Sequence, residues 1–112
     1  MQVLSGAASF GARSGGEPHW VEHLSVSDLS VGTYSLPSGG LDTQEPHTED
    51  ELYVVLRGRG ALATDDGSAE VGPGSVVYIP AGEPHRFVNI VEDLVALVLF
   101  APAEGTRAGA DA

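Results

Sequence analysis

Two short segments of the chain bring together the residue types that hold metal ions and transfer protons. The first contains Glu45, His47 and Glu51 and runs on to Tyr53, and the second contains His85. Successive side chains of an extended strand face opposite sides, so Glu45 and His47 are expected to share one face, as are Glu51 and Tyr53. Two imidazoles and one carboxylate form the ligand set of open non-haem iron sites, and they suit zinc, manganese or nickel equally.

The elements that must position these side chains are predicted to be β-strands. No window of twelve residues repeats apolar positions with a helical period unless Gly or Pro interrupts it. Apolar runs rich in β-branched residues alternate instead with Gly/Pro turns, which predicts an all-β sandwich or barrel. We expect strands at residues 19–24, 29–36, 52–56, 60–64, 76–79, 86–90 and 94–100, and a tight hairpin at Asp65-Asp66-Gly67.

The two ends of the chain offer little to bury. We expect residues 1–16 to form a flexible arm, residues 17–102 a single β-barrel domain, and residues 103–112 a tail that frays.

Both segments resemble the sequence motifs of the cupin superfamily, in particular its small single-domain bacterial members. The second cupin motif, a Gly, five residues, Pro-x-Gly, two residues, His, three residues and Asn, is matched in full by Gly74, Pro80, Gly82, His85 and Asn89. The first motif, a Gly, five residues, His-x-His, three or four residues, Glu, six residues and Gly, is matched by Gly39, His47, Glu51 and Gly58. Glu45 stands where the first His of that motif normally is. The resemblance covers about residues 29–102 and implies a jelly-roll β-barrel.

The resemblance also implies a metal site inside the barrel, held by His47, Glu51 and His85. Polar side chains that point into an apolar barrel are costly unless something satisfies them, and one divalent ion (iron(II), manganese, zinc or nickel) would do so. Glu45 is expected to be a fourth ligand or a nearby base, and Tyr53 a proton donor. Pro46 could instead bulge the strand and turn Gln44 inward.

Several of these residues also have ordinary structural explanations. Tyr53 could be a plain core aromatic, and the whole barrel could hold an empty pocket. Glu49 and Asp50 are expected to belong to a solvated turn. Asn89 is expected to be a turn residue or an outer hydrogen bonder, and the motif glycines to take turn conformations closed to other residues.

The function that the resemblance implies is that of a metal-dependent enzyme acting on a small molecule. Isomerase, lyase, decarboxylase and dioxygenase chemistry all remain open, because one fold supports many reactions. The alternative is a non-catalytic cupin that binds a small ligand or serves as an accessory module.

Composition excludes other classes of function. Sixteen acidic residues against five basic ones give a formal charge of −11, which argues against nucleic-acid and membrane partners. The absence of Cys excludes disulfides and thiol nucleophiles. No apolar run approaches the ~20 residues of a membrane span and no export signal is evident, so we expect a cytoplasmic protein.

Residues 19–24 are expected to form an exposed edge strand that carries Trp20, Val21 and Leu24, which predicts a homodimer.

Overall fold

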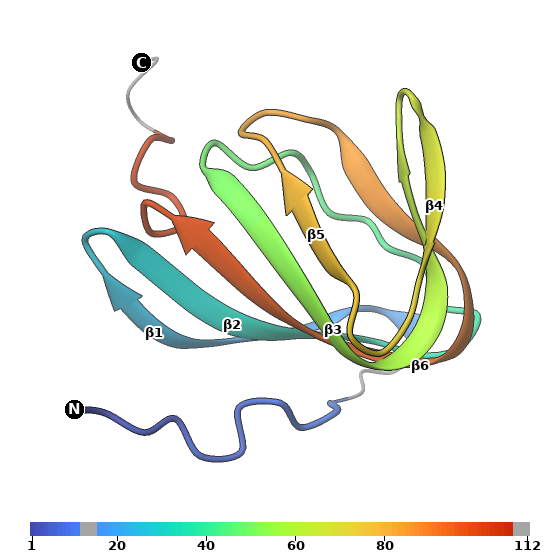
Figure 1. Ribbon diagram of the computed structural model, residues 1–112, viewed down its shortest axis with the longest axis horizontal. Coiled ribbons are helices and arrows are strands. Elements are labelled where there is room, and N and C mark those ends of the chain that lie inside the picture. Colours follow the sequence, from blue (N-terminus) through green and yellow to red (C-terminus); the bar gives the residue numbers. More distant parts are fainter. Residues whose placement is uncertain (12–15, 109–112) are drawn as a thin grey trace.

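The computed structural model describes residues 1–11 and 16–108, and in these residues the regular structure is antiparallel β-sheet. The strands are β1 (His19–Val26), β2 (Leu29–Leu36), β3 (Asp50–Thr64), β4 (Gly67–Val71), β5 (Val76–Ile79) and β6 (His85–Ala101). They pair in the order β1-β2-β6-β3-β4, and β5 pairs with the first part of β3. The sheet curls round on itself, with β3 and β6 running through its centre (Figure 1). The predicted all-β jelly-roll fold is confirmed.

Two strands are longer than the sequence predicts. Residues 52–56 and 60–64 belong to one strand, β3, and residues 86–90 and 94–100 to another, β6. The pairing of β3 with β6 shifts register between Val55 and Ala61, so the sheet bends there without ending. Gly58 lies in this bend at φ +89°, and a Cβ on it would come within 2.2 Å of the carbonyl oxygen of Asp93. Asn89 lies in the same bend at φ +51°, an unusual value for a residue other than glycine.

Turn positions agree with the sequence. The motif glycines Gly39, Gly58, Gly74 and Gly82 all have positive φ, as expected. The hairpin between β3 and β4 is present as well, closed by the pairing of Thr64 with Gly67.

The core fills the inside of the curled sheet. Its largest fully buried apolar side chains are Tyr53, Phe87, Phe100, Leu36 and Leu94. Burying each such side chain contributes about 1.5–3 kcal/mol relative to leaving it in water. Glu51 and Tyr53 share the inner face of β3, so the strand that builds the core also delivers the candidate site residues to it.

Both ends of the described chain contact the sheet. In the N-terminal segment, the amide of Gly11 donates to Ser35 Oγ at 3.1 Å, and the carbonyl of Ala8 accepts from Arg57 at 2.9 Å. Beyond β6, Ala103 is buried, and the amide of Glu104 donates to Ser30 Oγ at 2.9 Å. The segment after β6 therefore makes defined contacts with the barrel through residues 103–107. No helix among residues 1–11 and 16–108 has the length and apolar character that a membrane span requires.

Candidate metal centre and its pocket

Three side chains from separate elements meet inside the barrel. His47 lies in the loop before β3, Glu51 at the start of β3 and His85 at the start of β6. One potential ligand atom of each lies within 4.8 Å of those of the other two. Glu51 pairs with Phe100 at one end of β3, whereas His85 pairs with Thr64 at the other end. The bend in β3 and β6 is what brings these two ends to the same interior.

The buried carboxylate of Glu51 faces the imidazole of His85 across 2.9 Å, measured from Oε1 to Nε2. The other ring nitrogen, Nδ1, lies 2.8 Å from the carbonyl oxygen of Glu83 and must donate to it. A neutral His85 therefore turns the lone pair of Nε2 toward Glu51. Glu51 Oε1 has no hydrogen-bond donor, although the side chain is only 2% exposed. Facing lone pairs in a buried site repel unless a cation lies between them, either a proton or a metal ion.

The donor set fits a divalent ion. Ligand atoms bound to one ion at ~2.1 Å lie roughly 3–4 Å apart, so the cluster needs only a small contraction to close on a metal. The set itself, two imidazoles and a carboxylate, is the one expected from the sequence. The residues that the structure brings together could therefore hold one divalent ion.

Proton binding competes with a metal at His85. Burial by itself would lower the pKa of His85, but hydrogen bonds to Glu51 and to the carbonyl of Glu83 outweigh it and raise the pKa above its ordinary value of 6.5. In the metal-free protein the cation between His85 and Glu51 is thus a proton over a wider pH range than usual. A metal must displace that proton to bind.

His47, in the loop before β3, is the third member of the cluster. Its Nε2 lies 3.4 Å from Gln44 Oε1, and its Nδ1 lies 3.4 Å from a carboxylate oxygen of Glu104. The ring packs edge-on against Phe100, with 4.7 Å between the ring centroids. A carboxylate on the second nitrogen of a ligand imidazole orients the ring and raises its basicity. Burial raises the pKa of Glu104 itself, and the neighbouring His47 partly opposes that effect.

Gln44, not Glu45, occupies the inner position beside His47. Residues 40–47 form no strand, so the two-residue alternation that would place Glu45 inward does not apply. Glu45 is exposed and lies outside the cluster, which corrects its expected position next to His47. The Gln44 amide donates from Nε2 to Asp42 at 2.7 Å, so its Oε1 is the atom turned toward His47. The inward position of Gln44 is the one that the sequence offered as an alternative to Glu45, but it arises in a loop and not from a bulged strand.

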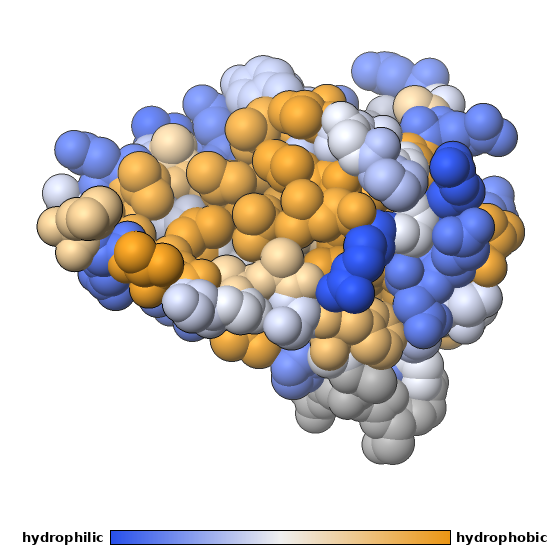
Figure 2. Space-filling model, turned by 60° about the horizontal axis from the view of Figure 1, so that its bottom comes forward, coloured by the Kyte–Doolittle hydropathy of each residue, from blue (hydrophilic) through white to orange (hydrophobic). Residues whose placement is uncertain are grey.

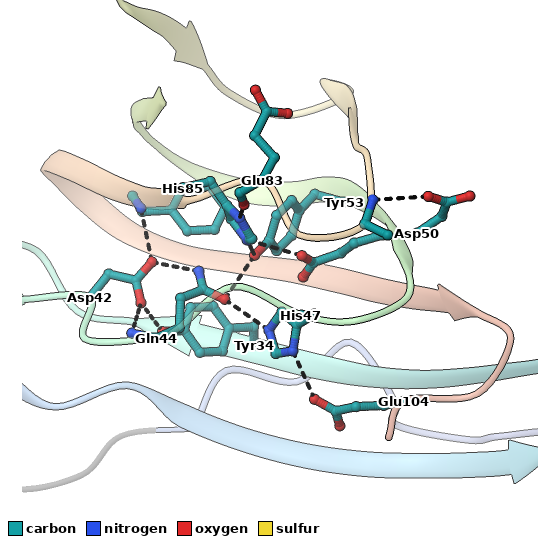
Figure 3. Close-up of polar contacts among 12 residues, drawn as sticks. Tyr34, Asp42, Gln44, His47, Asp50, Tyr53, Glu83, His85 and Glu104 are labelled. Atoms are coloured by element: carbon teal, nitrogen blue, oxygen red, sulfur yellow. Dashed lines mark hydrogen bonds and ion pairs between the residues drawn. The ribbon is translucent and has the colours of Figure 1, made fainter. Parts of the chain in front are cut away.

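Tyr53 reaches the cluster from the inner face of β3. Its hydroxyl lies 3.0 Å from His85 Nε2 and donates to Gln44 Oε1 at 3.1 Å (Figure 3). The side chain is 1% exposed. Burial, with the nearby Glu51 carboxylate adding to it, raises the pKa of Tyr53 far above its ordinary value. Tyr53 is therefore both a core aromatic and a protonated hydroxyl directed at the site.

Three acidic residues near the site were not identified from the sequence. Asp42 is buried and accepts from Tyr34, from the amide of Phe87 and from Gln44, so it fixes the loop that carries Gln44. Glu49 was expected in a solvated turn but is buried, and it binds the segment after β6. Glu104 has no motif around it and follows a strand in a stretch with few apolar residues. The roles of these three residues become visible only through their contacts with residues distant in the sequence.

The cluster opens into a pocket with a cavity volume of about 190 Å³. That volume lies below the ~300–1,000 Å³ usual for ligand pockets, so it suits only a small molecule. We refer to it as the site pocket; its lining residues are Trp20, Tyr34, Gln44, His47, Glu51, Tyr53, Val98, Phe100 and Glu104.

Comparisons with known proteins agree with this architecture. An uncharacterised protein of Streptomyces coelicolor is 42% identical over 92 residues, which cover 82% of this chain and 88% of that protein. Glucose-6-phosphate isomerase of Pyrococcus furiosus is 39% identical over 59 residues, but these span only 31% of the isomerase and 48% of this chain. A double-stranded β-helix protein from Klebsiella pneumoniae superposes with a TM-score of 0.78 at 17% identity over 91% of each chain. The family model of the cupin domain matches residues 32–101, and this chain therefore belongs to the cupin family.

Proposed function

We propose that this cupin binds one divalent metal ion through His47, Glu51 and His85 and uses it to act on a small oxygen-bearing molecule. The observation that carries the proposal is the buried Oε1 of Glu51, which meets no hydrogen-bond donor when His85 is neutral and faces Nε2 of His85 at 2.9 Å. An acceptor in this position is stabilised by a cation. The site pocket beside it supplies the room for a ligand.

When bound, a divalent ion supplies Lewis-acid polarisation of an oxygen-bearing ligand. The chain supplies the proton-transferring groups. The Tyr53 hydroxyl, kept protonated by its raised pKa, is placed to donate a hydrogen bond to a ligand at the inner end of the pocket, and a proton once that ligand becomes strongly basic during turnover. Gln44 orients that hydroxyl, and Glu83 fixes the tautomer of His85 through its carbonyl oxygen. Glu45 is exposed and takes no part in this arrangement.

The reaction class follows from the ligand that the pocket accepts, because neither the fold nor the metal ligands select one reaction. Isomerase, lyase, decarboxylase and dioxygenase chemistries all use such a site. A cupin that only binds its ligand would have the same metal centre and no turnover.

Metal content tests the proposal directly. Protein purified without chelator should contain about one divalent ion per chain by elemental analysis. His47→Ala and His85→Ala should each lower metal affinity at least about 100-fold while circular dichroism retains the β-sheet signal, because each removes one of three ligands. His19→Ala is the matched control, since His19 lies on β1 outside the cluster and its loss should leave metal content unchanged.

Two results would argue against the proposal. Wild-type protein that takes up no metal even when it is offered would indicate a barrel with an empty pocket. Equal metal uptake by wild type and His85→Ala would indicate a site elsewhere. With metal bound, turnover of a substrate panel separates an enzyme from a binding protein, and Tyr53→Phe should lower turnover far more than it lowers ligand affinity.

A further inference from the structure

The permanently charged side chains in the lining of the site pocket are acidic. Glu51 and Glu104 place carboxylates there beside the imidazole of His47, and no arginine or lysine lines the pocket in the described part of the chain. The sequence contains five basic residues, all arginine. Arg57 binds the carbonyl of Ala8, and Arg59 lies 3.8 Å from Glu92, both well outside the pocket. Arg86 and Arg107 are exposed, neither of them in its lining, and Arg13 lies outside the described residues.

Glu104 is held at the pocket by buried polar contacts. Its own amide donates to Ser30 Oγ at 2.9 Å. The amides of Gly105 and Arg107 both donate to the Glu49 carboxylate at 2.9 Å. Ser30 and Glu49 are each 1% exposed, so these anchors belong to the packed structure. The backbone that carries Glu104 is therefore anchored as one wall of the pocket, and its carboxylate lies in the lining, 3.4 Å from Nδ1 of His47.

The wall next to Glu104 is aromatic. Trp20 lies 6.5 Å from Tyr34 and 6.3 Å from Phe100, measured between ring centroids, and the rings are inclined to each other. All three line the site pocket. A desolvated cation is attracted by the faces of aromatic rings, and a neighbouring carboxylate adds a full charge to that attraction.

Building on the metal centre proposed above, we propose that the site pocket binds a small molecule that carries an ammonium-type cation together with an oxygen donor. The cation lies against Glu104 and the aromatic wall, and the oxygen faces the metal ligands. A bound divalent ion is balanced in formal charge by Glu51 and Glu104, so a cationic ligand meets no net repulsion. A phosphate ester finds no arginine or lysine in the described lining, and the formal charge of −11 repels it further. The sugar phosphate named for the isomerase relatives is thus a poor match for this pocket.

A pair of probes of equal shape tests the proposal. Choline carries a trimethylammonium group and a hydroxyl, and 3,3-dimethylbutan-1-ol replaces the cation by a neutral carbon. Trp20 is the single tryptophan of the sequence and lines the pocket, so its fluorescence reports binding in the metal-loaded protein, with calorimetry as a second readout. We expect choline to bind at least about tenfold more tightly than its neutral analogue. Glucose 6-phosphate should bind no better than glucose.

Two variants test whether the preference for choline over its neutral analogue depends on Glu104. Glu104→Gln keeps the shape of the side chain and should reduce the preference for choline to within about twofold. Glu92→Gln changes the net charge equally at the remote Arg59 pair, so it should leave the preference intact.

The outcomes separate this inference from the metal centre. Metal content is measured on the same samples. Protein that holds metal but binds both alcohols equally, binds neither, or prefers the phosphate overturns the cation proposal and leaves the metal centre standing. A preference for choline that survives in Glu104→Gln also overturns it. Protein that prefers choline but takes up no metal supports the cation subsite and contradicts the proposed metal function.

Discussion

The carboxylate of Glu49, in the loop just before β3, accepts a hydrogen bond of 2.9 Å from the backbone amide of Arg107, near the far end of the described chain. The amide of Gly105 and the hydroxyl of Thr48 donate to the same carboxylate. Burial would raise the pKa of Glu49, but these hydrogen bonds together outweigh it and lower the pKa below 4.5. An acidic residue in a charged run is thus the anchor of one pocket wall.

Glu49→Gln should therefore destabilise the protein by about 1–3 kcal/mol at pH 7, because a charged acceptor of several donors is lost. A carboxyl with a lowered pKa in the folded state contributes stability above its ordinary value of 4.5 and loses it as pH falls through the folded pKa. The difference in free energy of unfolding between wild type and Glu49→Gln should thus shrink below about pH 4. Urea unfolding of both proteins at pH 7 and pH 3.5 measures this difference. Glu70→Gln, on the exposed face of β4, should change neither value.

Gln44 and Glu45 offer a comparison between adjacent residues. Gln44→Ala removes the acceptor next to His47 and Tyr53, so metal affinity should fall about 10- to 100-fold. Glu45→Ala should leave affinity within about twofold, because its side chain is exposed outside the cluster. Competition with a metal indicator measures both. A larger loss from Glu45→Ala would show that the loop rearranges when metal binds.

The thermal stabilities of the metal-free and the metal-loaded protein should change in opposite directions as pH rises. The pKa of His85 is raised by Glu51 and Glu83 against the effect of burial, so in the metal-free protein this pair stabilises fully below pH 6.5 and loses its contribution as pH rises through the folded pKa. Metal requires deprotonated His85, so its stabilisation grows over the same range. Melting temperatures with and without chelator should diverge from pH 6 to pH 8.5. Parallel profiles would show that His85 is not a ligand.

We also propose that the protein is a homodimer. β1 is an edge strand, and exposed or half-buried apolar side chains lie along one row that crosses the sheet from it to β5, namely Val21, Leu97, Val54 and Val76. Thr33, between Val21 and Leu97 in this row, is buried. Figure 2 shows apolar side chains gathered over much of one face of the molecule. Apolar areas of this extent favour association.

Light scattering should give about twice the 11.5 kDa of one chain. The double variant Val21→Lys/Val76→Lys should give a folded monomer, whereas Val91→Lys, exposed in the bend of β6, should not change the mass. A wild-type mass of one chain at micromolar concentration would exclude the dimer.

The sequence predicts the fold class and the three-residue cluster well, because turn glycines and motif spacing act through local geometry. Gly74, Pro80 and His85 illustrate this: the turn they define delivers His85 into the barrel. The position of Glu45 was wrong because alternation holds only in strands, and residues 40–47 form none. The lengths of β3 and β6 were wrong because Gly58 bends a strand that continues.

The roles of Glu49 and Glu104 could not be predicted for a different reason. Each depends on a partner more than fifty positions away along the chain. No local pattern distinguishes a carboxylate that binds two distant amides from one that faces water.

The bend that folds β3 and β6 over the core has a kinetic consequence. Glu51 and His85 sit at opposite ends of the pairing of β3 with β6, and the pairing of Glu51 with Ile79 of β5 brings the turn before His85 to the same place, so the cluster needs β3, β5 and β6 assembled together. We expect such an assembly of segments distant in the sequence to form late in folding, after the transition state. A bound ion would then slow unfolding and leave the rate of folding unchanged. In that case the metal prolongs the lifetime of the native barrel without helping the chain to reach it.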